Sequence, residues 1–431
     1  MTPTKRIKPL SHKQFVMVNL RYIDFVDLTY QPKEDDVLCD FLVEPIDEEI
    51  EKAAGGVAAE SSIGTWTELT TTKPYVEKLR ATVFSIDGEN IRVAYPIELF
   101  EPGNMPNILS SVAGNIFGLK ALKNLRLNDI YLPPKLVKSF KGPKYGITGI
   151  RKLLKTRERP LVGTIIKPKL GLKPKDHAEV AYAAWVGGCD IVKDDENLSS
   201  QRFNPFEDRV VKTLERRDRA EEETGERKVY MANVTAETNE MLKRAQYVID
   251  QGGKYAMVDI LTCGFSALQT LRDQDFDLVL HAHRAGHAAF TKNPKHGISM
   301  RVIAKLARIV GVDQLHVGTV VGKMFENREE VIENCGALRE KMNEVKAVLP
   351  VASGGLHPGL VPSLVNIFGN DFVIQAGGGI HGHKDGTVSG AKAMRQAVDA
   401  TMQRISLEEY AKSHRELKTA LETWGTSLYE G

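Results

Sequence analysis

The run IVKDDEN, residues 191–197, places one lysine and three carboxylates at the end of a short apolar segment. Because side chains alternate along a strand, Lys193 and Asp195 should share one face, and Glu196 should follow at the loop. Carboxylate oxygens suit Mg²⁺, which keeps positions open for water and substrate. The commoner role of such a run is a solvated strand end. The lysine becomes a ligand only if carbon dioxide converts its neutral amine into a carbamate.

A second pair of lysines, Lys167 and Lys169, ends the run GTIIKPKLG. Two surface lysines beyond a strand would explain this pair equally well. If these lysines share one cleft with Lys193, each opposes protonation of the others, and burial acts in the same direction. Neutral amines would then be available for carbamylation and for proton transfer.

Histidines end two further apolar runs. LVLHAHRAGH places His281 and His283 on one face, followed by Arg284, and QLHVGTVVGK contains His316. A single histidine is more often a hydrogen-bonded core residue, but alternating histidines before an arginine indicate an anion site with a proton carrier. Lys323 follows in a glycine-flanked loop that could close as a lid.

Two glycine-rich segments, VASGGLHPG and VIQAGGGIHGH, follow the last two apolar runs. Either cluster could be only a tight turn. Backbone amides after the last two strands of a barrel, however, commonly hold a phosphate. The candidate substrate-binding residues here are Ser353, Gly354, Gly355, Gln375, Gly377 and Gly378.

The elements that must position these residues are eight β-branched runs between residues 161 and 379, separated by helix-like segments. This spacing predicts a closed parallel (β/α)₈ barrel, whose catalytic groups lie at the carboxyl ends of the strands. Most of the runs begin with apolar residues and end with polar ones. A purely structural strand has no reason to repeat this pattern, so it indicates that the strand ends have a function. We expect the barrel, with C-terminal helices, over residues 142–431 and a smaller α+β domain over residues 1–141.

Within the smaller domain, the patterns predict strands between about Gln14 and Val43 and a helix over 46–61. ATVFSI and IRVAYPI read as further strands, and residues 107–125 as a helix. The Pro-Pro sequence that follows marks a loop or linker.

Composition describes a globular protein of 431 residues, with 42% hydrophobic and 26% charged residues. The 58 basic and 56 acidic residues nearly balance and are scattered, which argues against a nucleic-acid or membrane partner. Four cysteines without CxxC spacing argue against a disulfide framework or a zinc site. No apolar stretch follows the basic start, so we expect a cytoplasmic protein. The residues alone thus indicate a magnesium enzyme acting on a doubly phosphorylated sugar, without specifying the reaction.

The motifs KPKLG, KDDEN, HAHRAGH, HVGTVVGK, SGGLHPG and QAGGG, in this order, resemble the large subunit of ribulose-1,5-bisphosphate carboxylase/oxygenase (RuBisCO). The resemblance begins at AAGGVAAESSIGTWT, and the GLHPG segment and short C-terminus are most similar to the archaeal, form III-like branch. It implies a ferredoxin-like α+β domain on a barrel, and a homodimer or larger homo-oligomer with active sites between subunits. The positions that match those contributed by the partner's N-terminal domain are Glu60, Thr65, Trp66 and Asn115.

The resemblance also implies a reaction. Carbon dioxide carbamylates Lys193, the carbamate holds Mg²⁺ with Asp195 and Glu196, and the same carbamate takes the C3 proton of ribulose 1,5-bisphosphate. A second carbon dioxide adds, Lys323 stabilises the new carboxylate, and cleavage gives two molecules of 3-phosphoglycerate, with oxygen as the competing substrate. Lys167, steered by Lys169, protonates the last carbanion.

The remaining implied roles concern substrate binding. His283 assists proton movement at C3, and Arg284 and His316 bind the C5 phosphate. Ser353 contacts a hydroxyl, and the C1 phosphate is bound by Thr65, Trp66, Gly355, Gly377 and Gly378.

The chain departs from the family pattern in MFENREE after Lys323 and in IHGHKDG after the triple glycine, and both departures bear on lid closure and turnover rate. A RuBisCO-like enolase or isomerase is the nearest alternative, and a non-catalytic sugar-phosphate sensor is a more distant one. The archaeal resemblance favours nucleoside salvage over a Calvin-type cycle. The residues alone do not distinguish these two pathways.

Overall fold

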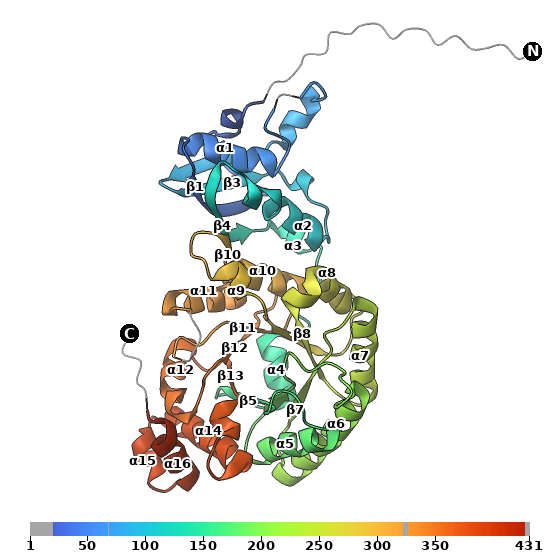
Figure 1. The fold of residues 1–431 in the computed structure, drawn as a ribbon, viewed down its shortest axis with the longest axis vertical. Coiled ribbons are helices and arrows are strands. Elements are labelled where there is room, and N and C mark those ends of the chain that lie inside the picture. The colour runs from blue at the N-terminus through green and yellow to red at the C-terminus, as the bar shows by residue number, and fades with distance from the viewer. Residues whose placement is uncertain (1–19, 68, 322–325, 427–431) are drawn as a thin grey trace, which may run out of the picture.

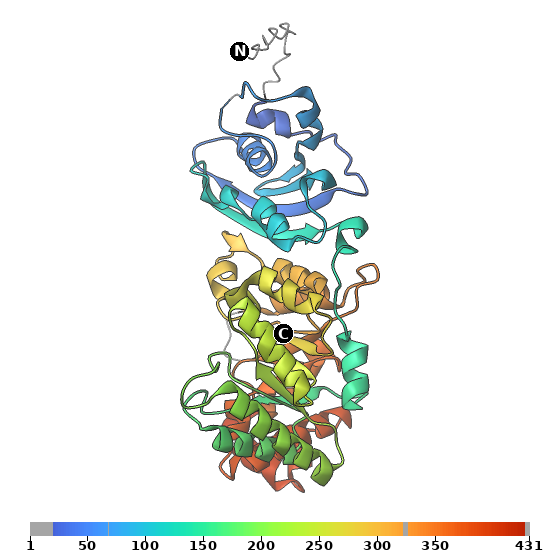
Figure 2. The same ribbon diagram turned by 90° about the vertical axis from the view of Figure 1, so that its right-hand side faces the viewer.

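The computed structural model describes residues 20–67, 69–321 and 326–426. A smaller N-terminal domain stacks on a closed barrel along the long axis of the molecule (Figure 1). The view at a right angle shows the same stacking (Figure 2). Lys323, predicted to lie in a lid, falls outside the described residues.

The N-terminal domain is built on a mixed sheet with the strand order β10-β4-β1-β3-β2. β1 pairs antiparallel with β3 and β4, and β2 pairs antiparallel with β3. β10 comes from the barrel half of the chain and pairs parallel with β4. The strands are β1 (Val37–Pro45), β2 (Thr82–Asp87), β3 (Asn90–Tyr95), β4 (Leu122–Tyr131) and β10 (Gly297–Ile298).

Helix α1 (Ile50–Glu60) covers one face of this sheet with small side chains. Its run of buried alanines and glycines lets the chain around Tyr22 approach closely. A Cβ at Gly55 would lie 2.0 Å from the carbonyl oxygen of Tyr22, so only glycine fits there. The Tyr22 hydroxyl donates a 2.7 Å hydrogen bond to Glu60 at the end of the helix, which fixes that carboxylate.

The remaining helices of this domain are α2 (Met105–Val112) and α3 (Pro134–Val137), with short 3₁₀ turns at η1 (Tyr22–Phe25), η2 (Pro74–Leu79), η3 (Ile97–Leu99) and η4 (Asn115–Gly118).

All eight predicted barrel runs form strands, and they close into one parallel barrel in the order β5-β6-β7-β8-β9-β11-β12-β13. Six of these strands are buried at every position because helices cover their outer faces and side chains fill the interior. The strands are β5 (Leu161–Ile165), β6 (Ile191–Lys193), β7 (Val229–Asn233), β8 (Tyr255–Asp259), β9 (Val279–His283), β11 (Gln314–His316), β12 (Leu349–Ser353) and β13 (Val373–Ala376).

Helix α4 (Gly146–Leu154) closes the amino-terminal end of the barrel. Its Ile150 and Leu154 are buried in the same cluster as the interior side chains Met231, Tyr255 and Met257. The outer helices are α5 (Pro174–Val186), α6 (Phe206–Thr224), α7 (Thr238–Asp250), α8 (Ile260–Asp273), α9 (Ala288–Thr291), α10 (Met300–Val310), α11 (Arg328–Arg339), α12 (Val361–Phe368), α13 (Gly378–His381), α14 (Gly386–Met402), α15 (Leu407–Ala411) and α16 (Arg415–Trp424), with a 3₁₀ turn at η5 (Pro358–Leu360).

Two expectations for the N-terminal domain need correction. The ten-residue strand β4 begins at Leu122, inside the segment expected to be helical, and helix α2 ends already at Val112. Between Leu20 and Val43, the described residues form the turn η1 and one strand rather than several strands. Within the described ranges, every helix is too short or too polar to span a lipid bilayer.

Candidate active site

Strand register brings the predicted chemical groups to one end of the barrel. Lys193 pairs with Ile165 on one side and with Met231 on the other. On the opposite wall, His281 pairs with Met257 and Gln314. Lys193 ends β6, and His283 and His316 end β9 and β11, so their side chains meet at the carboxyl-terminal mouth, where barrel enzymes carry their active sites.

A cavity of about 410 Å³ opens at this mouth. Twelve of its sixteen lining residues were predicted from the sequence. The lining consists of Ile165, Lys167, Lys193, Glu196, His283, Arg284, Ala285, Gly286, His287, His316, Ser353, Gly354, Gly355, Gln375, Gly377 and Gly378.

Lys193 reaches the cavity floor with only 1% of its surface exposed. Its amine donates a 2.7 Å hydrogen bond to the carbonyl oxygen of Asp194 and lies 3.5 Å from Glu196 Oε2. Met257 Sδ lies 3.2 Å away on the other side. Burial lowers the pKa of Lys193 below its ordinary value, although the neighbouring carboxylates oppose this. A buried amine of lowered pKa has the neutral form that reaction with carbon dioxide requires.

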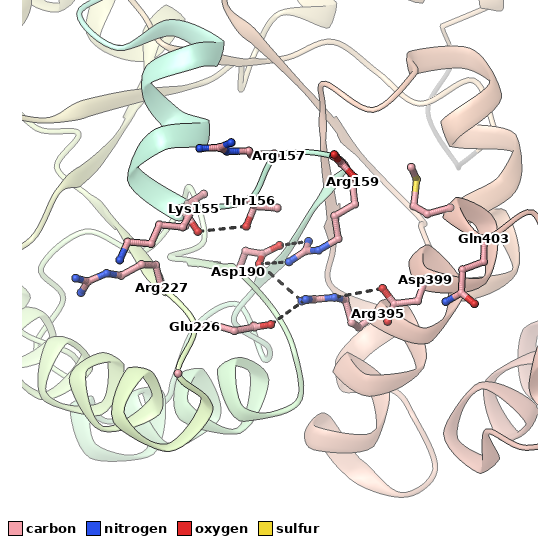
Figure 3. Close-up of a pocket in the computed structure, with 14 residues that line it drawn as sticks. Lys155, Thr156, Arg157, Arg159, Asp190, Glu226, Arg227, Arg395, Asp399 and Gln403 are labelled. Carbon is pink, nitrogen blue, oxygen red and sulfur yellow. Dashed lines mark hydrogen bonds and ion pairs between the residues drawn. The ribbon is translucent and has the colours of Figure 1, made fainter.

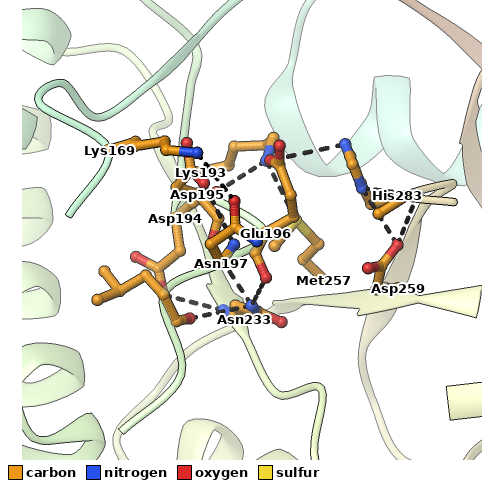
Figure 4. A network of polar contacts seen from close by, with 12 residues as sticks. Lys169, Lys193, Asp194, Asp195, Glu196, Asn197, Asn233, Met257, Asp259 and His283 are labelled. Carbon is orange, nitrogen blue, oxygen red and sulfur yellow. Dashed lines mark hydrogen bonds and ion pairs between the residues drawn. The ribbon is translucent and has the colours of Figure 1, made fainter. Parts of the chain in front are cut away.

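Two carboxylates flank this lysine (Figure 4). The Lys167 amine donates a 2.9 Å hydrogen bond to Asp195 Oδ2, which joins the ends of β5 and β6. Burial alone would raise the pKa of Glu196, but the charges of Lys193 and His283 hold it at about 2. Glu196 is therefore an anion at neutral pH and can serve as an oxygen ligand.

The loop that carries these carboxylates is held by a residue that no motif in the sequence marks. The buried side-chain amide of Asn233, at the end of β7, lies 3.4, 3.1 and 3.0 Å from the carbonyl oxygens of Asp195, Glu196 and Leu198. Asn233 also donates its backbone N–H to Asp194 Oδ2 at 2.9 Å. The loop geometry thus depends on a neighbouring strand.

Asp194 faces away from the cavity, as strand alternation requires. Its carboxylate accepts hydrogen bonds from Arg209 and Tyr230 at 3.1 and 2.8 Å, and the charge of Arg209 helps hold its pKa well below the ordinary range, despite complete burial. Asp194 is therefore a structural anion, distinct from its two neighbours.

The donor set fits Mg²⁺ only if Lys193 takes part. Among the described residues, no three histidine, cysteine, aspartate or glutamate side chains gather closely enough to hold a metal ion. Asp195 and Glu196 supply two carboxylates, and a carbamate on the buried Lys193 amine would supply a third anionic oxygen ligand beside them. The residues present therefore suit a hard divalent cation bound to a carbamylated lysine.

Three histidines cluster on the opposite side of the barrel, where His283 and His316 line the cavity and His281 is buried beside them. His281 Nε2 and His316 Nε2 lie 3.0 Å apart, and the His283 and His316 ring centroids lie 4.8 Å apart. Burial lowers the pKa of His281 to about 3 and holds that of His316 well below its ordinary value. Both rings are neutral at neutral pH, so they can act only as hydrogen-bond partners there.

His283 differs because carboxylates contact both of its ring nitrogens. Its Nδ1 lies 3.2 Å from Asp259 Oδ1, and its Nε2 lies 3.6 Å from Glu196 Oε2. Asp259 is fixed in turn by the backbone N–H of Ala285 at 2.8 Å. This arrangement orients an imidazole toward the candidate metal ligands, and Asp259 was not singled out from the sequence.

Arg284 is buried at the cavity edge beside Glu326. Its Nη2 donates a 2.6 Å hydrogen bond to Glu326 Oε1, and both side chains are at most 5% exposed. The sequence predicts a phosphate at Arg284 but gives no sign of a carboxylate there.

On the glycine-rich wall, glycines leave room for longer side chains. A Cβ at Gly377 would lie 3.1 Å from Lys167 Cε, and a Cβ at Gly163 would lie 2.3 Å from Gln375 Oε1. The Gln375 amide is fully buried, and neither its nitrogen nor its oxygen has a hydrogen-bond partner among the described residues. An unsatisfied buried amide beside a cavity is suited to bind a polar ligand.

Other predicted residues lie outside this cavity. Lys169 is exposed and donates to Asn197 Oδ1 at 3.3 Å. Four residues expected to serve a partner's site also do not line the cavity: Glu60, Thr65, Trp66 and Asn115. Of these, Trp66 is 82% exposed.

A second hollow, of about 690 Å³, lies at the amino-terminal end of the barrel (Figure 3). Arg159 donates two 2.7 Å hydrogen bonds to Asp190 there, and Arg395 binds Glu226 at 2.9 Å. The first pair joins the start of β5 to the segment before β6, and the second joins α14 to the segment before β7, which indicates a structural role at this end.

Comparisons with known proteins agree with this architecture. The family model "Ribulose bisphosphate carboxylase large chain, catalytic domain" matches residues 146–424, and the corresponding N-terminal domain model matches residues 24–136. The ribulose bisphosphate carboxylase of Methanocaldococcus jannaschii is 52% identical over 430 residues, covering 93% of this chain and 100% of the relative. That of Pyrococcus furiosus is 52% identical over 410 residues, covering 94% and 98%.

Solved structures of related proteins share this fold. The octameric Rubisco of Pyrococcus horikoshii in complex with sulfate ion superposes with a TM-score of 0.93 at 49% identity, covering 95% of this chain and 98% of that one. The dimeric archaeal Rubisco of Hyperthermus butylicus gives 0.88 at 48% identity, covering 94% and 100%. With both family models matched, and with relatives about half identical over nearly its whole length, the chain belongs to the ribulose bisphosphate carboxylase large chain family.

Proposed function

We propose that this protein is a ribulose-1,5-bisphosphate carboxylase that depends on Mg²⁺ and on a carbamate at Lys193. The observation that carries the proposal is the buried Lys193 amine at the mouth of the barrel, which lies 3.5 Å from Glu196 Oε2 and interacts with the charge of Asp195. Family membership supports the reaction, because the curated relatives are ribulose bisphosphate carboxylases.

In this proposal, carbamylated Lys193, Asp195 and Glu196 hold the metal. Bound Mg²⁺ would supply Lewis-acid polarisation of the substrate's carbonyl oxygen. The lowered pKa of Lys193 supports carbamylation. Carbamylation removes the lysine cation that lowers the pKa of Glu196, so bound Mg²⁺ would become the counter-charge of that carboxylate.

The proposed proton carriers are His283 and Lys167. His283, oriented by Asp259, would move a proton at C3 of the sugar. Lys167 would protonate the final carbanion, and its contact with Asp195 keeps it beside the metal ligands. We propose that Lys169 assists Lys167 and that Lys323 stabilises the new carboxylate, roles that rest on the family resemblance.

The two phosphates are proposed to lie at opposite ends of the cavity. Arg284 and His316 would bind the C5 phosphate, and the amides of Gly355, Gly377 and Gly378 the C1 phosphate. Ser353 would contact a substrate hydroxyl, and Gly354 and Gln375 complete the wall.

The active site is proposed to be completed across a homodimer. Glu60, Thr65, Trp66 and Asn115 would reach the partner's cavity, and the 82% exposure of Trp66 supports this. Related structures are dimeric and octameric, so larger assemblies fit the same scheme. We further propose a role in nucleoside salvage, supported by the archaeal origin of the relatives.

The decisive experiment measures 3-phosphoglycerate formed from ribulose 1,5-bisphosphate with and without carbon dioxide and Mg²⁺, and with Lys193→Ala as a control. We expect two product molecules per bisphosphate consumed and no turnover by the variant. Isomerised sugar phosphate in place of 3-phosphoglycerate would indicate an enolase or isomerase. Tight sugar-phosphate binding without turnover would indicate a sensor.

A further inference from the structure

We propose that Glu326 is an affinity-determining residue of the phosphate site at Arg284: its carboxylate binds Arg284 in the anion-free enzyme and gives way when a phosphate binds. The inference rests on the proposed function in taking that phosphate to belong to the substrate.

The geometry supports exchange rather than permanent pairing. Arg284 and Glu326 are joined by one hydrogen bond, from Nη2 to Oε1 at 2.6 Å. Arg284 Nη1 and Glu326 Oε2 are both buried, and neither has a hydrogen-bond partner among the described residues. Leaving buried polar atoms unsatisfied is costly. A phosphate, with several oxygens, could satisfy both guanidinium nitrogens, and the released carboxylate could be hydrated.

Arg159, a structural arginine of the same chain, pairs with its carboxylate in a different geometry. Arg159 donates from both of its terminal nitrogens to the two oxygens of Asp190, each at 2.7 Å (Figure 3). That fork-to-fork pair satisfies both partners, and it lies at the end of the barrel away from the candidate active site. The single contact of Arg284 with Glu326 lacks this complementarity and occurs at the cavity edge.

Charge makes the exchange necessary. Arg284 is the cation of the proposed C5 phosphate site, and Glu326 cancels its charge. The nearby imidazoles do not replace that charge, because burial lowers the pKa of His287 to about 3 and keeps the pKa of His316 well below its ordinary value. With Glu326 in place, a phosphate dianion would meet no net positive charge from these four side chains.

Glu326 belongs to the MFENREE segment in which the sequence departs from the family pattern. The departure therefore bears on substrate affinity through Arg284, a residue far from it in the sequence.

The test is isothermal titration of inorganic phosphate into wild type and Glu326→Gln, followed by steady-state kinetics with ribulose 1,5-bisphosphate. We expect the variant to bind phosphate about tenfold more tightly, the size of one charge-assisted hydrogen bond that no longer competes. The KM for the bisphosphate should fall while kcat changes less. In an Arg284→Ala background, the same substitution should have no effect on phosphate binding.

Glu330→Gln is the matched control. The charge of Glu330 also acts on Arg284, but no hydrogen bond between described residues joins the two. Equal tightening by Glu330→Gln would overturn the specific role of Glu326. Unchanged or weaker phosphate binding by Glu326→Gln would also overturn it and would make Glu326 a support for Arg284.

A second variant guards against misfolding. Glu326→Asp keeps the charge but withdraws the carboxylate by one methylene, so phosphate binding should tighten by a smaller factor. The same binding constant as wild type would count against competition. Phosphate titration needs no turnover, so a wild type that fails to make 3-phosphoglycerate would refute the proposed function without deciding this inference.

Discussion

Replacing Asn233 by alanine should loosen the loop that carries the candidate metal ligands. The side-chain amide lies within 3.4 Å of the carbonyl oxygens of Asp195, Glu196 and Leu198. Its two N–H groups can make two good hydrogen bonds at a time. Alanine removes both and leaves buried carbonyl oxygens without a donor.

The expected loss of stability follows from that count. Leaving a buried polar group without its partner costs about 1–3 kcal/mol, so the loss of two hydrogen bonds should lower the unfolding free energy by about 2–6 kcal/mol. Loss of a residue that orients metal ligands typically weakens metal affinity about 10- to 100-fold. Asn233→Ala should therefore need correspondingly more Mg²⁺ for half-maximal carboxylation.

Denaturant unfolding and Mg²⁺ titrations of carboxylation, made on the same preparations, would measure both effects. Asn239→Ala is the control, because Asn239 is exposed in the first turn of α7 and should change stability by less than about 0.5 kcal/mol. A variant that loses stability but keeps the wild-type Mg²⁺ dependence would refute the link between Asn233 and metal binding. If both properties were unchanged, the hydrogen bonds themselves would be unimportant.

Three further predictions test other parts of the molecule. Arg159 holds the pKa of the buried Asp190 below its ordinary value of 3.8, so the stabilisation is complete above pH 3.8 and is lost as the pH falls through the folded-state pKa. Asp190→Asn should therefore lower the free energy of unfolding, measured with denaturant, by about 3–5 kcal/mol at pH 7 and by clearly less below pH 3.8. An equal loss at both pH values would contradict this. Glu60→Gln chains mixed with Lys193→Ala chains should recover carboxylation in hybrid dimers, and inactivity despite proven subunit exchange would count against a shared site. Gly163→Ala places a Cβ 2.3 Å from the Gln375 amide oxygen. It should therefore lower the unfolding free energy by about 1–3 kcal/mol and raise the KM for ribulose 1,5-bisphosphate. Wild-type values of both quantities would show that the amide moves freely.

The barrel and most of its mouth were predictable because local patterns determine them. Each strand is a short β-branched run that ends in polar residues, and the parallel barrel fold places those ends together. Lys193, Glu196, His283 and His316 therefore converge as expected from one repeated pattern.

Contacts between distant segments were not predictable in this way. Asn233 acts on carbonyl oxygens of a different loop, and Glu326 meets Arg284 across 42 residues, so no local spacing reveals either contact. Strand β4 was missed because the polar side chains in LKNLRLNDIY hide its alternation, and its pairing with β1 determines its structure. Which chain completes each active site also depends on assembly rather than on local sequence.

The pairing of β10 with β4 gives the two domains a mechanical connection. β10 follows the loop after His283 and α9, and Arg126 of β4 also donates a hydrogen bond to the carbonyl oxygen of Thr291 in that connection. The segment leaving one cavity is thus fastened to the domain proposed to reach the partner's cavity. In the proposed dimer, a displacement of the segment after His283 at one catalytic centre would therefore shift the N-terminal domain that serves the other centre.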